Sequence, residues 1–398
     1  SQICALPGNG GIANDADCID IGAKEIDKIV DFAVKEKIDY AIVAPDDPLV
    51  LGCVDALESK GIPCFGPDSK AAVIEGSKVF SKNLMKKYGI PTAEYEVFDD
   101  CVKAIEYLET ASVPVVIKAD GLALGKGVII AETKEAAKTA VLDIMQAKKF
   151  GSSGNRIVIE EYLTGPEISV LSFTDGKTVK PMISSMDHKR IGENDTGLNT
   201  GGMGTVAPNP YYTEEIAAEC MEKIFLPTIA AMNAEGRTFK GCLYFGLMLT
   251  KKGPMVIEYN CRFGDPEAQV VLPRMKNDIL EVMEACIDGT LDQVDLQFED
   301  NAAVCVVLAS EGYPVSYEKG FPITGLEEFK KHEGYYCFHA GTKFNGDQIV
   351  TNGGRVLGVT AKGKDLKEAR ANAYAATEWV NFKNKYMRHD IGKAIDEA

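Results

Sequence analysis

The chain has 398 residues, enough for two or three domains, and a formal net charge of −16, which argues against binding nucleic acid through a basic surface. Hydrophobic residues make up 45% of it, the mean hydropathy is −0.07, and no apolar run approaches the ~20 residues of a membrane span. Composition therefore predicts a soluble globular protein without a membrane segment, and nothing at the start resembles a signal peptide.

The eleven cysteines are scattered along the chain, often inside apolar stretches such as those around Cys242 and Cys305. Their number is odd, and no pair has the close spacing of metal ligands, so a zinc site is discarded. Scattered apolar cysteines are typical of reduced, buried thiols. Because thiols stay reduced in the cytoplasm, we expect a cytoplasmic protein.

The first part of the chain predicts a small parallel α/β domain. Residues 1–6 form half a strand that runs into Pro7–Gly11, which suggests that the natural chain begins earlier. The apolar run Tyr40–Ala44 predicts a buried parallel strand. Asp46 follows this strand directly, at the position where an α/β sheet usually places its ligands.

A glycine-rich stretch follows the basic amphipathic helix expected at Lys78–Tyr88. Here Gly125 and Gly127 flank Lys126 between two β runs, and Lys118 ends the first of these runs. The pattern is not a Walker motif, which needs GK[ST] opening a helix. Glycines let backbone N–H groups approach phosphate oxygens, so a flap over a phosphate chain is one interpretation. A flexible hairpin with a solvated lysine is an equally good one.

Paired carboxylates end the next expected strand, Arg156–Leu163. They are Glu160 and Glu161, and Glu167 follows after a Gly-Pro pair. One such carboxylate can accept hydrogen bonds from ribose hydroxyls while the neighbouring backbone contacts an adenine edge. Seen alone, a pair of glutamates at a strand end is more often simply solvated.

The most polar loop of the chain is expected at Met186–Pro208. A loop of this length in a compact domain is either functional or disordered. Its glycine-rich centre, Asn199–Gly204, favours a backbone that grips a ligand. For His188, an orienting hydrogen bond is as good an interpretation as catalysis.

The stretch Met255–Gln269 concentrates chemistry at the end of an expected buried strand. Side chains of a strand alternate between its two faces, so Glu258 and Asn260 share a face. A carboxylate and an amide oxygen suit Mg²⁺, which leaves its other positions to phosphates and water. Arg262 adds a fork that matches a carboxylate or phosphate, and Asp265 adds a further carboxylate. Solvated charges at a strand end are the alternative, but this concentration of polar groups favours a metal–phosphate site.

Together these features resemble the ATP-grasp superfamily, and more closely the glycinamide ribonucleotide synthetase (phosphoribosylamine–glycine ligase) family of purine biosynthesis. The matching phrases follow the family order over nearly the whole chain, and DHKR…NTGGMG and EYNxRFGDPE are highly specific, whereas the glycine-rich flap is weak evidence alone. They are FGP…AAVIEGSKVFSK (Phe65–Lys82), IKADGLALGKGV (Ile117–Val128), IEEYLTGPEIS (Ile159–Ser169), DHKRIGENDTGLNTGGMG (Asp187–Gly204), IEYNCRFGDPEAQ (Ile257–Gln269) and TNGGRVLGVTA (Thr351–Ala361).

The resemblance implies an α/β fold with an ATP-grasp core, an N-terminal parallel α/β domain whose first strand is missing, and a small C-terminal α+β domain. With a new buried strand expected from residue 302, we place the substrate domain at 1–75, the ATP-grasp domain at 76–300 with a mobile lid at about 111–173, and the C-terminal domain at 301–398.

The activity implied is ATP-dependent ligation of glycine to 5-phosphoribosylamine through a glycyl phosphate. No protein nucleophile is needed, because catalysis is positioning and neutralisation of charge on the transferring phosphoryl group. ATP and Mg²⁺ (or Mn²⁺) are the expected cofactors. A transient contact with the enzyme that makes phosphoribosylamine is a further expectation.

Carried over residue by residue, the resemblance implies these roles. ATP would be bound by Lys78 and Lys118 at the phosphates, by the flap residues Gly125, Lys126 and Gly127, by Glu160, Glu161, Tyr162 and Leu163 at the adenine, and by Glu167 at the ribose, while Glu258 and Asn260 hold the metal. The other substrates would be bound by Pro7, Gly8, Asn9, Asp46, Asp195, Asn199, Thr200, Gly201, Gly202 and Met203, with Arg262, Asp187 and Asp265 as the catalytic candidates.

Two departures from the family pattern keep alternatives open. The usual opening strand and glycine-rich turn are missing, with Pro7–Gly11 as the remnant, and the strand CLYFGLMLT lacks the second metal-binding acid of many relatives. The rivals are another ATP-grasp carboxylate–amine ligase and a nucleotide-binding module without turnover. A dinucleotide oxidoreductase is weaker, because no G-x-G-x-x-G follows a strand in a βαβ setting.

Overall fold

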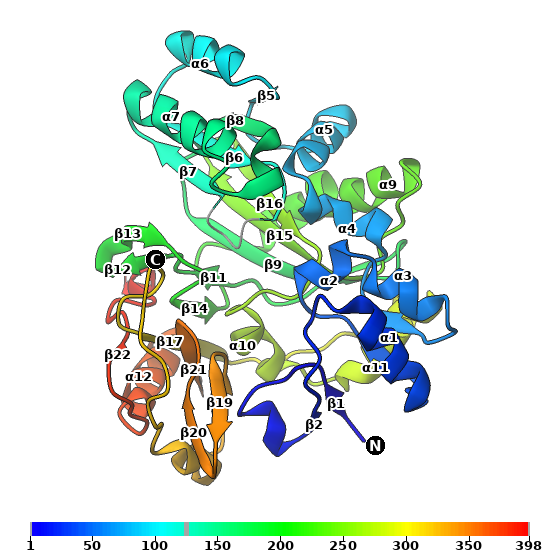
Figure 1. Cartoon of the computed structure of the whole chain (residues 1–398), viewed down its shortest axis with the longest axis vertical. Coiled ribbons are helices and arrows are strands. Elements are labelled where there is room, and N and C mark those ends of the chain that lie inside the picture. Colours follow the sequence, from blue (N-terminus) through cyan, green and yellow to red (C-terminus); the bar gives the residue numbers. More distant parts are fainter. Residues whose placement is uncertain (1, 123–126, 397–398) are drawn as a thin grey trace.

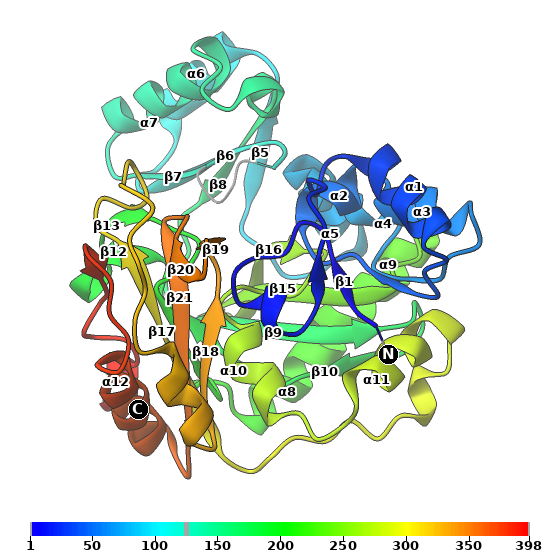
Figure 2. The same ribbon diagram turned by 60° about the horizontal axis from the view of Figure 1, so that its bottom comes forward.

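Three larger sheets organise the computed structural model, which describes residues 2–122 and 127–396. Figure 1 shows a lid sheet above a central sheet, with the N-terminal helices to the right and the C-terminal sheet at lower left. Figure 2 shows the same arrangement from a second direction. Gly125 and Lys126, two residues of the expected flap, lie outside the described part of the chain.

The central sheet is antiparallel, with the strand order β10-β9-β15-β16. Its middle strand β15 is an almost unbroken apolar run, and its first seven residues are buried, as expected for a strand covered on both faces. A two-residue turn leads from β15 into β16, the strand that carries the expected metal ligands. The strands span Val179–Pro181 (β10), Glu167–Thr174 (β9), Gly241–Thr250 (β15) and Gly253–Asn260 (β16).

A β-bulge interrupts β16 just before Glu258. Gly246 of β15 pairs with Glu258, but the next residue of β15, Leu247, pairs with Val256, so Ile257 is the extra residue. Bulges bend a strand and redirect its side chains, and they are common beside active sites. Beyond the bulge the alternation resumes, with Tyr259 buried in the core and both Glu258 and Asn260 lining a cleft.

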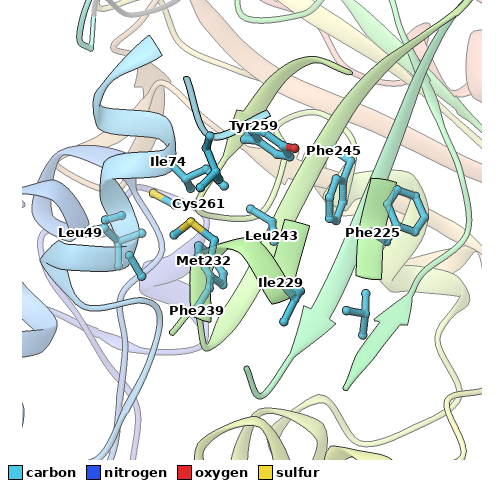
Figure 3. Close-up of a cluster of buried hydrophobic side chains, with 14 of the residues drawn as sticks. Leu49, Ile74, Phe225, Ile229, Met232, Phe239, Leu243, Phe245, Tyr259 and Cys261 are labelled. Carbon is cyan, nitrogen blue, oxygen red and sulfur yellow. The ribbon is translucent and has the colours of Figure 1, made fainter. Parts of the chain in front are cut away.

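The largest core cluster lies between the central sheet and the helices that cover it (Figure 3). Phe245 is fully buried at its centre, with its ring centroid 4.3 Å from that of Phe225 and 5.7 Å from that of Tyr259. The helix that carries Pro227 is preceded directly by a wider turn at Met221–Phe225. The helices around the sheet span Ser69–Gly76 (α4), Lys78–Tyr88 (α5), Glu214–Cys220 (α8), Leu226–Ala234 (α9), Ala268–Val271 (α10) and Ile279–Asp288 (α11).

The lid consists of an antiparallel sheet of order β5-β8-β6-β7 covered by two helices, with a core of its own. Its elements run from residue 95 to residue 161, whereas β9, inside the expected lid range of about 111–173, belongs to the central sheet. The elements span Tyr95–Phe98 (β5), Cys101–Thr110 (α6), Val115–Ala119 (β6), Val128–Ala131 (β7), Lys134–Val141 (α7) and Ile157–Glu161 (β8).

The C-terminal sheet includes two strands from the expected polar loop. Strands β11 and β14, which flank that loop, pair in the order β11-β14-β17-β21-β18, and β22 also pairs with β17. The segment Met186–Pro208 is therefore an ordered part of the C-terminal sheet, and the side chains of Met203 and Val206 are fully buried. The elements span Met186–Asp187 (β11), Arg190–Gly192 (β12), Thr196–Asn199 (β13), Gly204–Ala207 (β14), Ala302–Ser310 (β17), Tyr335–His339 (β18), Thr342–Asn345 (β19), Gln348–Thr351 (β20), Arg355–Gly363 (β21), Leu366–Thr377 (α12) and Lys385–Tyr386 (β22).

The N-terminal part is helical with short parallel strand pairs, and one expectation about it is wrong. The run Tyr40–Ala44 is not a buried strand, because only Ala41 and Ile42 pair, with Cys64 and Phe65, and Ile42 is 50% exposed. Among the described residues this strand pairs on one edge only, so its other edge is open. The elements span Cys4–Ala5 (β1), Asp17–Cys18 (β2), Ile26–Lys35 (α1), Ala41–Ile42 (β3), Asp46–Val50 (α2), Cys53–Glu58 (α3) and Cys64–Phe65 (β4).

None of the helices in residues 2–122 and 127–396 combines the length and the apolar character that crossing a membrane requires.

We expect Phe245→Ala to lower the free energy of unfolding by about 3–5 kcal/mol, because it leaves a cavity beside Phe225 and Tyr259. Urea denaturation followed by circular dichroism measures the change. Val102→Ala on α6, where the side chain is 62% exposed, is the control and should shift stability by less than about 0.5 kcal/mol. Equal losses in the two variants would contradict this description of the core.

Candidate functional site

One large cleft, with a volume of about 1810 Å³, lies where the lid, the central sheet and the C-terminal sheet meet. Its walls come from α4 and α5, from lid strands β6 and β8, from the end of β16, and from the segment between β11 and β14. Most residues that the sequence singled out line this cleft. The arrangement explains how segments more than a hundred residues apart act at one place.

Glu258 and Asn260 lie at the end of β16 on the cleft wall, as the strand alternation predicts. The Lys189 ammonium bridges two carboxylates, with its Nζ 3.1 Å from Glu258 Oε1 and 3.4 Å from Glu167 Oε2. Lys189 is the main reason that the pKa of Glu258 falls from its ordinary 4.5 to about 2, with Lys118 and Lys78 contributing against the effect of burial. Glu258 is therefore an anion at any neutral pH, ready to bind a cation.

Arg262 is held in place from three directions. Its Nη2 lies 3.3 Å from Glu75 Oε1 and 3.3 Å from Asn260 Oδ1, and its Nη1 donates to the carbonyl oxygen of Phe263. Glu75, which is 8% exposed, also accepts hydrogen bonds from the backbone N–H and thiol of Cys261. The end of α4 thus anchors the end of β16, and the guanidinium is oriented beside the candidate metal ligands.

Two lysines pair with Glu160 at the junction of lid and core, and a third, Lys78, lines the same cleft. Lys118 Nζ lies 3.0 Å from Glu160 Oε2 and donates to the carbonyl oxygen of Ile257, the bulged residue of β16. Lys82 Nζ lies 3.7 Å from the same carboxylate, and burial lowers the pKa of Lys82 to about 8. Lys78 donates to the carbonyl oxygen of Gly121 at 2.9 Å, and burial lowers the pKa of Lys78 as well.

The other oxygen of Glu160, Oε1, is buried and has no hydrogen-bond partner among the described residues. An unpaired buried acceptor is costly unless a ligand supplies the donor. The next three residues, Glu161, Tyr162 and Leu163, also line the cleft, and Tyr162 is 41% exposed there. This segment therefore fits a flat ligand with an exocyclic amine, such as adenine.

The chain leaves this segment through Gly165, which only a glycine can occupy. Its φ is +148°, and a Cβ there would collide with the carbonyl oxygen of Leu249 on β15. The close approach turns the chain into β9, whose first residue, Glu167, faces the cleft within reach of Lys189. Gly127, the one described residue of the expected flap triplet, also lines the cleft.

The glycine-rich segment Asn199–Met203 lies between the C-terminal sheet and the exit of β16. The backbone of Met203 bonds to His188 and to Val307 of β17, and Thr200 Oγ1 donates to the carbonyl oxygen of Lys189. At Gly202, where φ is +118°, a Cβ would lie 2.7 Å from Asp187 Oδ1. Asn199, Thr200 and Gly201 line the cleft, whereas Met203 is fully buried and serves through its backbone.

Two carboxylates, those of the half-buried Asp187 and the buried Glu267, line the cleft. Burial raises the pKa of Asp187, and the nearby Glu267 raises it further, although Lys189 acts in the opposite direction. Glu267 lies 3.3 Å from Ser169 Oγ, and burial raises the pKa of its carboxyl too. The pair therefore has a higher proton affinity than isolated carboxylates, which suits a place that receives or holds a proton from an amine.

The structure places the remaining candidates in three different settings. Asp46 lines the cleft. Asp265 also lines it, and its carboxylate pairs with Arg355 Nη2 at 3.0 Å. Asp195 pairs with Arg388 Nη1 at 3.0 Å, so its carboxylate is already engaged.

Asn9 is engaged outside the cleft walls, since its Nδ2 donates to the carbonyl oxygen of His339 and its Oδ1 accepts from Gly11 and Ile12. Pro7 and Gly8 do not line the cleft either, although Ile12 does.

Four functional side chains escaped the sequence analysis. Lys189 and Glu75 lie inside the quoted stretches DHKR and AAVIEGSK, so their position in a specific motif was an available signal. Lys82 ends the longer quoted stretch AAVIEGSKVFSK, but its approach to Glu160 depends on how the lid folds. Arg388 had no comparable signal, because it stands in a short polar stretch near the end of the chain.

No group of three or more His, Cys, Asp and Glu side chains among residues 2–122 and 127–396 has the geometry of a metal site. The donors at the end of β16 nevertheless fit a hard divalent cation. One carboxylate and one amide oxygen are what Mg²⁺ takes from a protein when phosphate oxygens and water complete its octahedron. The site therefore needs a phosphate-bearing ligand to be complete.

Comparisons with known proteins agree with this geometry. Profiles of the phosphoribosylglycinamide synthetase N domain, ATP-grasp (A) domain and C domain match residues 1–75, 76–268 and 303–394. A phosphoribosylamine–glycine ligase from Caldanaerobacter subterraneus subsp. tengcongensis is 49% identical over 391 residues, which cover 98% of this chain and 93% of that protein. The namesake from Halalkalibacterium halodurans is 46% identical over 397 residues, covering 100% of this chain and 92% of that one.

Solved structures show the same similarity. The crystal structure of phosphoribosylamine–glycine ligase from Thermotoga maritima superposes with a TM-score of 0.84 at 33% identity, over 98% of this chain and 93% of that one. The biotin carboxylase domain of 2-oxoglutarate carboxylase from Hydrogenobacter thermophilus reaches a TM-score of 0.74 at 17% identity, over 97% and 86%. The second match concerns the fold alone.

We expect Lys189→Met to lower the melting temperature of the ligand-free protein in a pH-dependent way. The pKa of Glu258 is about 2 in the folded protein against an ordinary 4.5, so its pairing stabilises the fold above pH 4.5 and is lost as the pH falls from 4.5 towards 2. The gap between wild type and variant should therefore be largest near neutral pH and shrink below pH 4.5.

Differential scanning calorimetry across this pH range measures the gap. Lys252→Met, in the exposed turn between β15 and β16, is the control and should show no gap at any pH. A gap for Lys189→Met that stays constant with pH would refute the assigned pairing.

Proposed function

The chain belongs to the phosphoribosylglycinamide synthetase family, and on that premise we propose that the central cleft is where it joins glycine to 5-phosphoribosylamine in an ATP-dependent reaction. One observation carries the assignment to this cleft. The end of β16 presents Glu258, Asn260 and Arg262 to the same space as the lysines at the lid and the glycine-rich segment Asn199–Met203. Metal–phosphate chemistry and amine binding thus meet at one place.

The reaction balances without a nucleophile from the protein. A carboxylate oxygen of glycine attacks the γ-phosphorus of ATP, ADP leaves, and glycyl phosphate forms. The amine of 5-phosphoribosylamine then attacks the glycyl carbonyl carbon, inorganic phosphate leaves, and the amine loses a proton as the amide of glycinamide ribonucleotide forms. Catalysis consists of alignment and charge neutralisation, as in other phosphoryl transfers.

ATP is assigned to the side of the cleft between the lid and the core. Lys78 and Lys118 contact its phosphates, and Gly127 of the expected flap lines the same space. Adenine lies against Glu160–Leu163, where the unpaired Oε1 of Glu160 can accept from its amino group, and Glu167 accepts from the ribose hydroxyls. The support is the buried orphan acceptor, together with lysines held ready by Glu160.

Mg²⁺, with Mn²⁺ as a substitute, is assigned to Glu258 and Asn260. When bound there, the cation neutralises charge on the phosphate oxygens and orients them for in-line transfer. The ammonium of Lys189 now bridges Glu258 and Glu167, so it must adjust when the cation binds.

Glycine and 5-phosphoribosylamine are assigned to the remaining walls of the cleft. Arg262 steadies the carboxylate of glycine or the transferring phosphoryl group, since Glu75 and Asn260 fix its direction. Asp187 and Asp265 complete the catalytic set, and the raised pKa of Asp187 fits a proton acceptor for the attacking amine. Asp46, the backbone of Asn199–Met203 and Asp195 orient the substrates, and Pro7, Gly8 and Asn9 remain candidates for the sugar phosphate.

Two expectations about the setting of the enzyme are kept as proposals. All eleven cysteines are free thiols, and seven of them are buried, which favours a reducing cytoplasm. Because phosphoribosylamine is labile, a transient contact with the enzyme that makes it would limit its loss.

ADP release in mixtures that each lack one component tests the function. We expect release only with ATP, Mg²⁺, glycine and freshly generated phosphoribosylamine together, since the acyl phosphate turns over only when the amine arrives. Release with another acid in place of glycine, or without any amine, would favour a different ligase. ATP binding without any release would favour a module that does not turn over.

We expect Glu258→Ala to lower turnover at saturating Mg²⁺ by at least about a hundredfold, because it removes the only charged protein ligand assigned to the cation. Steady-state assays over a range of Mg²⁺ concentrations measure the loss. Glu215→Ala, which removes an exposed carboxylate on α8, should keep wild-type turnover. Wild-type turnover in Glu258→Ala would contradict the assignment of Glu258 as a ligand of the cation.

A further inference from the structure

The last residues of the C-terminal domain run along the hairpin formed by β12 and β13. In Figure 1 this red segment lies beside the green hairpin. Tyr386 donates its hydroxyl to the carbonyl oxygen of Ile191, and the backbone N–H of Gly392 donates to Nε2 of His188 at 3.1 Å. Contacts thus begin before the hairpin and continue along it, so the two segments form one unit.

Arg388 is the centre of this contact and is only 1% exposed. Its Nε and Nη2 form a two-pronged pair with Asp390, each at 2.8 Å. Its Nη1 donates to the carbonyl oxygen of Arg190 and to Asp195 Oδ1, both at 3.0 Å. Four of the five N–H donors of a guanidinium are therefore used inside the protein, and the side chain acts through the hairpin.

The hairpin turn needs such support because two successive non-glycine residues have a left-handed backbone. The φ angles are +54° for Asn194 and +52° for Asp195. Such turns suit a β-hairpin but usually place glycine at the second position, and a side chain there is strained unless its surroundings hold it. Asp390 accepts a hydrogen bond from the backbone N–H of Asn194 at 2.7 Å, and Lys393 Nζ donates to Asn194 Oδ1. Arg388 holds Asp195.

The supported hairpin forms a wall of the cleft beside the last residues of the C-terminal domain. Asn194 and Asp195 line the cleft, as do Arg388 and Asp390. ATP and glycine must meet at Glu258 and Arg262, where phosphoryl transfer takes place. The substrate left to fill the space beside the C-terminal sheet is the largest one apart from ATP, the phosphorylated sugar amine.

We propose that Arg388 is a positioning residue for the amine acceptor: by holding the Asn194–Asp195 turn, it sets the wall against which 5-phosphoribosylamine is aligned. This inference rests on the proposed function. Arginine is required because a lysine ammonium cannot bridge Asp390, Asp195 and the carbonyl oxygen of Arg190 in one plane. Asp195 is then part of the cleft wall, because Arg388 holds its carboxylate, and it does not select the substrate as a free carboxylate.

Arg388→Lys keeps the charge and removes the bridge, so it tests the proposal. We expect the KM for phosphoribosylamine to rise about tenfold, because misplacing a substrate by about 1 Å can cost up to 10²-fold. The KM for ATP and for glycine should stay at the wild-type value. In the ligand-free protein, backbone amides of residues 190–199 should exchange hydrogen for deuterium faster than in wild type.

Arg274→Met is the matched control, since Arg274 is also buried, at 3% exposure, but bonds to Asn301 and Glu299 away from the cleft. It should change neither the KM for phosphoribosylamine nor exchange in the hairpin. If Arg388→Lys does not fold, Asp195→Asn serves instead, because it weakens one contact of a side chain that is 69% exposed. The same two readouts should then move in the same direction, by less.

Equal changes in the KM of all three substrates, or no change, would overturn the proposal, as would unchanged exchange in the hairpin. Failure of the proposed function shows differently, as a wild type whose ADP release does not depend on phosphoribosylamine. In that case the claim about the acceptor falls with it, and the exchange measurement still decides whether Arg388 holds the hairpin.

Discussion

The cleft depends on pairing between buried carboxylates and cations that come from other segments of the chain. Glu160 of the lid pairs with Lys118 and Lys82, Glu75 of α4 pairs with Arg262, and Glu258 of β16 pairs with Lys189. An unpaired buried charge costs several kcal/mol, so each pair holds two segments together. The pairs also explain how a chain with a net charge of −16 can receive polyanions. Lys118, Lys189 and Arg262 line the cleft where the phosphates of ATP are proposed to bind, and the protein's own carboxylates hold them there.

The second constraint is the path of the chain between the two lower sheets. Strand β14 pairs with β11 on one side and with β17 on the other, so the glycine-rich segment between β11 and β14 is fixed by the C-terminal sheet. The carbonyl oxygens of that segment meet Arg355 of β21, which also binds Asp265 at the exit of β16. Three regions of the chain therefore build the side of the cleft that is proposed to bind 5-phosphoribosylamine. A change in any of these regions alters the shape of this side.

Local patterns predicted much of this structure. Alternation along β16 placed Glu258 and Asn260 on one face, helical periodicity gave α5 with its bounds, and the apolar run of β15 marked the central strand. What escaped were features set by distant pairing. The strands within Met186–Pro208 are stabilised by β17, about a hundred residues later, so no local sequence pattern predicts them. Likewise, the partner of Asp195 is Arg388, and the exposure of Ile42 depends on which strands pair beside it.

The bulge at Ile257 has a consequence for how this strand can change during evolution. The extra residue places Glu258 and Asn260 towards the cleft while Tyr259 stays in the core, and it frees the carbonyl oxygen of Ile257 for Lys118. Substitutions by similar side chains leave that arrangement intact. Insertion or deletion of one residue in β16 would exchange the two faces and drive Glu258 and Asn260 into the hydrophobic core. We therefore expect relatives to differ in the residues of this strand but to keep its length.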